Sequence, residues 1–218
     1  MQNQFEASKY VNIEERLDQA RIKTWEAVDR IAAQYKPGID EKEAIRIAQR
    51  TLAEMGSRKF WHKCHVRFGE GTTKSFNDPY TDNILKPDDI FYIDLGPIWE
   101  SIEGDAGRTF VVGDNPIYKK AEKDVRTLFD LVSHHWRAHG ISGKELYKFA
   151  GEEAEKLGWV LAPSYVRGHR LSEFPHSLYT EATLEELDFR PASKRWVLEV
   201  HICDPTMKFG AFYEDILT

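Results

Sequence analysis

A pattern that opens at residue 38 recurs at residue 140, and this repeat constrains the fold more than any other feature of the sequence. Gly-Ile-Asp-x-Lys-Glu at 38–43 corresponds to Gly-Ile-Ser-x-Lys-Glu at 140–145, an offset of 102 residues that also relates Gly56 to Gly158. Helix starts in general resemble one another, so the match can arise without common ancestry. The alternative, which we favour, is an internal duplication in which each half is a helix pair followed by strands.

Local patterns support two such halves. Apolar residues recur every three or four positions over 13–35, which predicts a helix, and a capping box at Asp40 and Glu43 begins a second one. Residues 59–112 are rich in strand-forming and turn residues, and a new helix pair is predicted from about Ile117. No linker or low-complexity stretch interrupts the chain. We therefore expect residues 1–218 to form a single domain of the α+β class, with the helices against one face of one sheet.

Composition excludes several function classes. A formal net charge of −6 argues against nucleic acid as a partner, because phosphate binding needs a basic surface. No apolar run approaches the roughly 20 residues needed to cross a bilayer, so we expect no membrane partner. The first residues have no secretory leader pattern, and Cys64 and Cys203 are too few for a disulfide framework. These features predict a cytoplasmic protein.

Charged groups in apolar strands are the candidates for chemistry. Asp94 and Glu199 each lie inside a run of apolar residues, and Asp105 and Glu214 stand in or beside neighbouring predicted strands. Carboxylates about 4 Å apart repel by about 4 kcal/mol per pair at an effective dielectric constant of ~20. Four converging carboxylates can therefore coexist if two divalent cations lie between them. Oxygen ligands with an imidazole, for which His169 is the candidate, suit Mn²⁺, Fe²⁺, Co²⁺ or Zn²⁺.

The candidate ligands, in chain order, are Asp94, Asp105, His169, Glu199 and Glu214. In their types and order they resemble the five metal ligands of the methionine aminopeptidase, prolidase and aminopeptidase P family. Asp-Leu-Gly at 94–96, Gly-Asp-x-x-Arg-Thr-Phe at 104–110, and the step of seven residues from His169 to His176 match the family closely. The resemblance runs from about Ile13 to the C-terminus and covers only the catalytic domain of the larger members. It implies the pita-bread fold, a duplicated α+β domain whose curved antiparallel sheet carries two helix pairs on one face.

The resemblance also implies roles. Asp94 would bind one metal ion, Asp105 and Glu214 would bridge both, and His169 and Glu199 would complete the second site. A hydroxide bridging the two metal ions (Mn, Co, Fe or Zn) would attack the substrate. Glu199 would exchange its protons, and His176 would hydrogen-bond the tetrahedral intermediate. The implied activity is an aminopeptidase that removes N-terminal residues, similar to Xaa-Pro aminopeptidases.

Three departures from the family concern the substrate. Arg170 follows His169 where the family has a glycine, Ser177 replaces a glutamate, and Asn77 lies where the family has a substrate-binding histidine, seventeen residues before Asp94. We expect four residues to contact the substrate: Asn77, Arg170, His65 and His201. His65 is chosen from the pair His62 and His65, either of which can replace the missing histidine.

The departures leave other functions open. The chain could hydrolyse a non-peptide amide or ester with the same metal ions, or it could be a catalytically silent domain that binds a peptide or protein. We expect a peptide or a small molecule as the substrate. A homodimer is possible, in which the partner is a second copy of the chain.

Overall fold

The structure is a computed structural model that describes residues 4–75, 77–163 and 167–218. The first half contains helices α1 (Ile13–Ala32) and α2 (Glu41–Glu54), followed by strands β1 (His65–Phe68), β2 (Asp89–Leu95) and β5 (Ala106–Val112). A small hairpin, β3 (Ile98–Trp99) and β4 (Ile102–Glu103), lies between β2 and β5. The second half contains α3 (Pro116–His139), α4 (Gly143–Lys156), β6 (Val160–Leu161), β7 (His169–Arg170), β8 (Trp196–Cys203) and β9 (Gly210–Ile216). The described residues also form four short 3₁₀ helices: η1 (Gln4–Glu6), η2 (Gly69–Thr73), η3 (His176–Leu178) and η4 (Leu184–Glu186).

The two halves repeat at the offset seen in the sequence. Helices α2 and α4 are both 14 residues long and begin at equivalent positions. The side chain of Asp40 accepts a hydrogen bond from the Glu43 backbone N–H at 2.7 Å, and Ser142 caps α4 in the same way. Gly56 and Gly158 follow the two helices with φ angles of 99° and 88°, a left-handed conformation that favours glycine. The repeat therefore extends from sequence into local structure.

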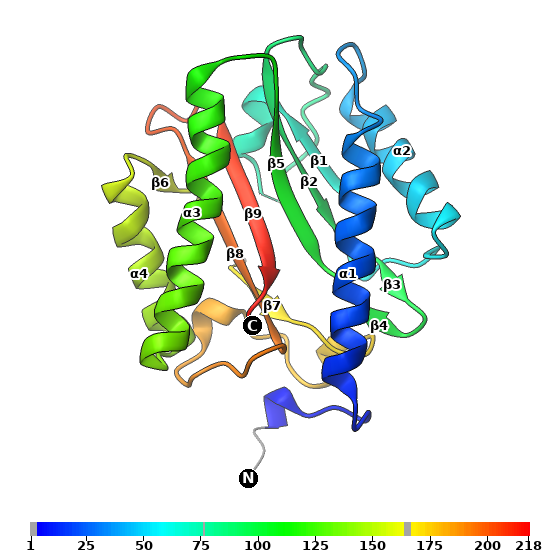
Figure 1. Ribbon diagram of the computed structural model, residues 1–218, viewed down its shortest axis with the longest axis vertical. Coiled ribbons are helices and arrows are strands. Elements are labelled where there is room, and N and C mark those ends of the chain that lie inside the picture. Colours follow the sequence, from blue (N-terminus) through cyan, green and yellow to red (C-terminus); the bar gives the residue numbers. More distant parts are fainter. Residues whose placement is uncertain (1–3, 76, 164–166) are drawn as a thin grey trace.

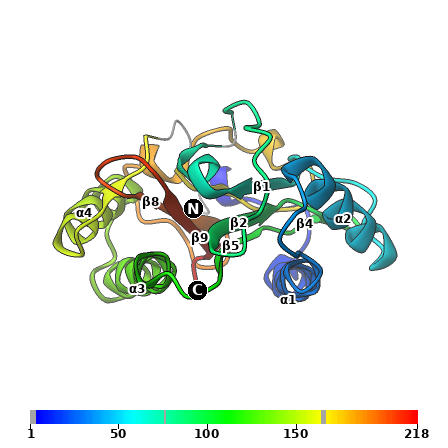
Figure 2. The ribbon, with the colours of Figure 1, turned by 90° about the horizontal axis from the view of Figure 1, so that it is seen from above.

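One antiparallel sheet joins the halves. Its strand order is β1-β2-β5-β9-β8-β6, and β7 pairs with β8 beside β6. The halves meet where β5 pairs with β9 (Figure 1). Figure 2 shows the helices gathered along one side of the sheet, with α1 and α3 near its middle and α2 and α4 at its flanks. The predicted α+β pita-bread class is confirmed.

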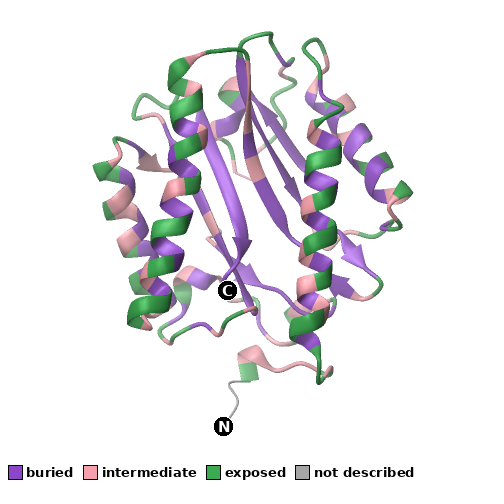
Figure 3. Ribbon diagram, viewed as in Figure 1, coloured by how far each residue is buried: buried purple, intermediate pink, exposed green. Residues whose placement is uncertain are grey.

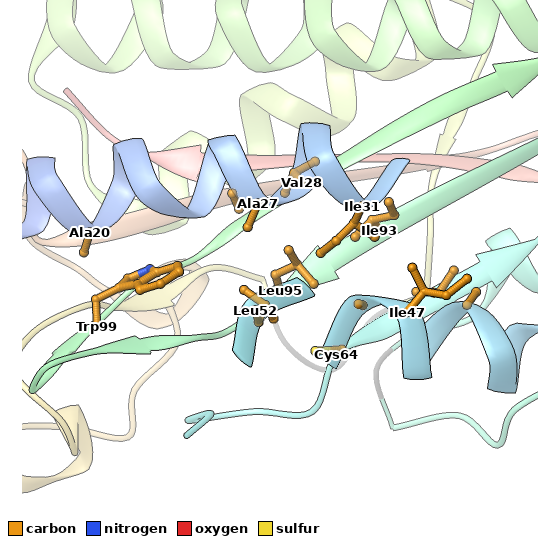
Figure 4. Packing of buried hydrophobic residues seen from close by; sticks show 14 of the residues in the cluster. Ala20, Ala27, Val28, Ile31, Ile47, Leu52, Cys64, Ile93, Leu95 and Trp99 are labelled. Atoms are coloured by element: carbon orange, nitrogen blue, oxygen red, sulfur yellow. The ribbon is translucent and has the colours of Figure 1, made fainter. Parts of the chain in front are cut away.

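The apolar core lies between helices and sheet and has one cluster in each half. Figure 3 shows the strands almost entirely buried and the helices buried along one stripe. In the first cluster, Ala27, Ile31 and Leu52 of the helices pack against Ile93 and Leu95 of β2 (Figure 4). Truncating such a residue to alanine costs about 2–5 kcal/mol. Because strand residues alternate between faces, the same packing turns Asp94 away from the helices.

The chain between residues 4 and 10 packs against the second half. Phe5 stacks on Phe189 with ring centroids 6.0 Å apart, and the Glu6 carboxylate accepts hydrogen bonds from the Ala192 backbone N–H and the Trp196 indole. These contacts join the start of the described chain to segments about 190 residues away. Within the described ranges, no helix combines the length and apolar character that crossing a bilayer would require.

Candidate metal centre

Three of the predicted ligands lie in one row across the sheet. Asp94 on β2 pairs with Gly107 on β5, Gly107 pairs with Glu214 on β9, and Glu214 pairs with Glu199 on β8. Paired residues in adjacent strands project from the same face. Gly107 is required in this row, because a Cβ atom there would lie 2.6 Å from Glu214 Oε1. The register thus directs three carboxylates into one space.

Asp105 and His169 enter the same space from its two sides. Asp105 directly precedes β5, and His169 on β7 is brought alongside β8 by its pairing with Val197. His169 Nε2 lies 2.6 Å from Asp105 Oδ2 and 3.5 Å from Glu199 Oε1. All five predicted ligands line a single cavity of about 410 Å³.

The cavity concentrates negative charge. Burial and repulsion by Asp105, Asp94 and Glu199 raise the pKa of Glu214 well above its ordinary value. Burial also raises the pKa of Glu199 to about 7 and that of Asp94 to about 6, with nearby carboxylates adding to both shifts. Burial opposes a charge on His169, but Asp105 outweighs it and raises the imidazole pKa to about 9. The arrangement favours cations.

The donor set suits divalent cations. Asp94 Oδ1 and Glu214 Oε1 are buried, and neither accepts a hydrogen bond from any residue that the structure describes. Ligand atoms of Asp105, His169 and Glu214 lie within 4.8 Å of one another. Buried carboxylate oxygens without partners are costly unless a cation binds them, and oxygen donors with imidazole are suited to Mn²⁺, Fe²⁺, Co²⁺ and Zn²⁺. The residues therefore fit the metal ions that the sequence implies.

His176 lies on η3 at the wall of the cavity, held by a buried carboxylate. Glu103 Oε1 accepts a hydrogen bond from the His176 backbone N–H at 2.9 Å, and Glu103 Oε2 lies 3.0 Å from His176 Nδ1. The Trp61 ring packs against three histidines of the cavity, His62, His169 and His176, with centroids 4.2–5.2 Å away. These contacts fix the His176 imidazole with Nδ1 towards Glu103.

The four residues expected to contact the substrate lie in different places. His201 lines the cavity, where its Nε2–H donates to the Thr72 carbonyl at 2.7 Å, and burial lowers its pKa to about 4. His65 is buried beside Asp94, its partner in the β1–β2 register, and is not among the residues that line the cavity. Asn77 is exposed and lies outside the cavity lining.

The expectation for Arg170 is corrected by the structure. Its neighbour His169 faces the cavity, but strand alternation turns Arg170 to the other side, where it is completely buried. Its guanidinium donates to the backbone carbonyls of Phe5 and Ala7 and to the Ser172 hydroxyl. Arg170 therefore holds the N-terminal segment and does not reach a substrate in the cavity.

Sequence reasoning missed two residues of the site. His62 Nε2 lies 3.3 Å from Asp105 Oδ1 and 3.4 Å from Asp94 Oδ1, and Glu103 holds His176. Strand β1 begins only at His65, so His62 lies on the preceding loop and strand alternation does not orient its ring. The sequence feature that pointed to His62 was the pair of histidines in Trp-His-Lys-Cys-His at 61–65.

Comparison with known proteins agrees with the resemblance. The profile of metallopeptidase family M24 matches residues 15–212. No curated protein matches the chain significantly. Because the family profile spans most of the chain, it carries the assignment of the family.

Solved structures share the fold. The X-Pro aminopeptidase from Thermotoga maritima is 19% identical, with a TM-score of 0.77 over 99% of this chain and 63% of that chain. The prolidase from Pyrococcus furiosus is also 19% identical, with a TM-score of 0.76 over 98% and 63% of the two chains. The methionine aminopeptidase from Thermotoga maritima is 14% identical, with a TM-score of 0.77 over 96% and 94%. This chain thus spans about three fifths of the first two and nearly all of the third.

Proposed function

The chain belongs to metallopeptidase family M24, and on this premise we propose that it is an aminopeptidase with a dinuclear metal centre. The ligands would be the five residues that the sequence predicts: Asp94, Asp105, His169, Glu199 and Glu214. The observation that carries the proposal is the convergence of these side chains in one cavity, with buried oxygens of Asp94 and Glu214 that accept no hydrogen bond from the described residues.

The proposed chemistry follows from the residues. Bound divalent cations would polarise the scissile carbonyl and acidify a water molecule so that it attacks near neutral pH. A Glu199 carboxylate oxygen would receive the proton of that water and pass it to the leaving amine. A carboxylate oxygen accepts hydrogen bonds, so His176 Nδ1 carries a proton towards Glu103, and the negative charge of Glu103 would stabilise an imidazolium. The Nε2–H of that imidazolium would donate to the oxyanion of the tetrahedral intermediate.

The cavity supports a small peptide substrate with an apolar residue. Its walls include the aromatic rings of Trp61, Tyr92, Phe174 and Phe212. A volume of about 410 Å³ is within the range of pockets that enclose small ligands. The likeness to an X-Pro aminopeptidase and to prolidases suggests proline as the second residue. We propose release of the N-terminal residue from short Xaa-Pro peptides.

We further propose that the chain acts as one domain in a reducing compartment, the cytoplasm. Cys64 and Cys203 are both free and buried, which is typical of proteins from such compartments.

The test is a cleavage panel on the purified chain loaded with Mn²⁺. The peptides Ala-Pro-Phe, Ala-Ala-Phe and Met-Ala-Phe are compared by mass spectrometry with an ester and a phosphodiester, alongside metal stoichiometry. We expect two Mn²⁺ ions per chain and release of alanine from Ala-Pro-Phe, both reduced in Asp105→Ala and Glu214→Gln. Metal binding with hydrolysis of only the ester or phosphodiester would overturn the peptidase assignment. Absence of metal binding would leave a silent binding domain.

A further inference from the structure

We propose that His62 is an additional ligand of the metal centre, on the side of Asp94. Each end of the centre would then carry one imidazole, His62 at one end and His169 at the other. The inference rests on the proposed function, because it assumes that cations bind among the carboxylates. The sequence resemblance assigns no role of this kind to His62.

The first support is that both imidazoles are held in the same way. His62 Nδ1 lies 2.7 Å from the carbonyl oxygen of Lys63, and His169 Nδ1 lies 2.9 Å from the carbonyl oxygen of Arg170. In each case the acceptor belongs to the next residue along the chain. A carbonyl oxygen only accepts, so Nδ1 carries a proton in each ring, and loss of the proton on Nε2 would leave the Nε2 lone pair facing the cavity. This is the tautomer that binds metal ions through Nε2.

The second support is the position of the two Nε2 atoms around Asp105. Oδ1 of this carboxylate faces His62 at 3.3 Å, and Oδ2 faces His169 at 2.6 Å. Each imidazole also faces one further carboxylate, Asp94 at 3.4 Å from His62 and Glu199 at 3.5 Å from His169. Two ligands of one ion, each bonded at about 2.1 Å, lie about 3.0–3.4 Å apart for octahedral or tetrahedral geometry. His62 is at the separation expected of a ligand that shares an ion with Asp94 and Asp105.

The third support is that the surroundings accommodate the His62 ring closely. A Cβ atom at Gly96 would lie 2.1 Å from His62 Cδ2, so only glycine leaves room for the ring beside β2. Trp61 packs edge-on against His62 at 4.2 Å, and the Trp61 backbone N–H donates to the Gly96 carbonyl at 3.0 Å. The His62 side chain retains only 15% of its exposure. Its orientation towards the carboxylates is thus fixed by packing on several sides.

The experiment measures metal binding and needs no substrate. Calorimetric titration with Mn²⁺ alone compares the unaltered chain with His62→Gln and with His134→Gln, an exposed histidine on α3 that serves as the matched control. We expect His62→Gln to bind one of two Mn²⁺ ions at least about tenfold more weakly, as ligand-shell changes typically do, and His134→Gln to bind as the unaltered chain does. Equal affinities in all three proteins would overturn the proposal.

A spectroscopic count of imidazoles keeps the proposal testable if His62→Gln is unstable. In the unaltered chain loaded with Co²⁺, each Nε2-bound histidine contributes one paramagnetically shifted Nδ1–H proton resonance. Two such resonances are expected, and one would refute a ligand role for His62. Failure of the proposed function has a different signature, because the unaltered chain would then bind neither Mn²⁺ nor Co²⁺.

Discussion

Glu103 and His176 are joined by two hydrogen bonds: the carboxylate accepts from the His176 backbone N–H at 2.9 Å and from Nδ1 at 3.0 Å. Glu103 also accepts from the Ser172 backbone N–H at 3.1 Å and is almost completely buried. One carboxylate from the β3–β4 hairpin therefore positions both the backbone and the ring of the proposed oxyanion donor.

Replacing Glu103 with glutamine should reduce turnover. The amide keeps the size of the side chain but removes the negative charge that, in the proposed mechanism, stabilises His176 as it donates to the oxyanion. We expect kcat to fall by about tenfold or more with little change in KM, since the interaction acts mainly in the transition state. Steady-state kinetics on Ala-Pro-Phe measure the effect, with the exposed Glu54→Gln as the control. A rise in KM with unchanged kcat would assign Glu103 to substrate binding.

Gly107→Ala should weaken metal binding. The new methyl group would lie 2.4 Å from Phe212 Cε1 and 2.6 Å from Glu214 Oε1, so the Glu214 carboxylate must move. We expect Mn²⁺ affinity to fall by at least about tenfold and stability by about 1–3 kcal/mol, the cost of overpacking. The control is Gly151→Ala on α4, where the nearest atom would be 3.7 Å away. That variant should bind Mn²⁺ normally, and unaltered binding by Gly107→Ala would contradict the geometry of the row.

Arg170→Met should release the N-terminal segment. The change keeps most of the side-chain volume but removes the hydrogen bonds that Arg170 donates to the carbonyls of Phe5 and Ala7. Losing partners of buried polar groups costs about 1–3 kcal/mol each. We expect a lower unfolding free energy in urea and faster proteolysis before Tyr10, neither of which should occur in the exposed control Arg58→Met. Proteolysis before Tyr10 at the rate seen in the unaltered chain would show that other contacts hold the segment.

Stability should decrease in acid through Glu173. Burial raises the pKa of this carboxyl, but hydrogen bonds from Tyr179, the Lys9 backbone, Ser172 and Ser8 outweigh it and lower the pKa to about 2. The folded pKa lies below the ordinary value of 4.5, so the stabilisation is complete above about pH 5 and is lost as the pH falls towards 2. Urea unfolding should show that Glu173→Gln has a lower unfolding free energy than the unaltered chain at pH 6, and that this difference is smaller at pH 3. An equal difference in unfolding free energy at both pH values would exclude the carboxylate charge as its cause. The control is Glu152→Gln, at an exposed position.

The fold and the proposed ligand set could be read from the sequence because both depend on local signals. The capping residues Asp40 and Ser142 terminate helices through contacts three residues away, and carboxylates inside apolar strands stand out without any tertiary information. The row of carboxylates is different. It depends on the pairing of Gly107 with Glu214, which are far apart in sequence, and no local pattern determines that register.

The errors have the same origin. Arg170 is expected at the substrate because it stands where the family has a glycine, but its partners are Phe5 and Ala7, more than 160 residues away. His65 is the histidine expected at the substrate, but it lies on β1, whereas His62 lies on the loop before that strand. A loop residue can turn its ring in directions that period-2 alternation does not allow, and here it turns towards Asp94 and Asp105.

The meeting of β5 and β9 has a consequence for the origin of the site. The first half contributes Asp94 and Asp105, and the second half contributes His169, Glu199 and Glu214, so neither half holds the whole proposed ligand set. If the chain arose by duplication of a gene for one half, an ancestral half could have assembled such a centre only by pairing with a second copy of itself. Fusion of the two copies would then have let their sequences diverge, so that one half came to provide more of the ligands than the other.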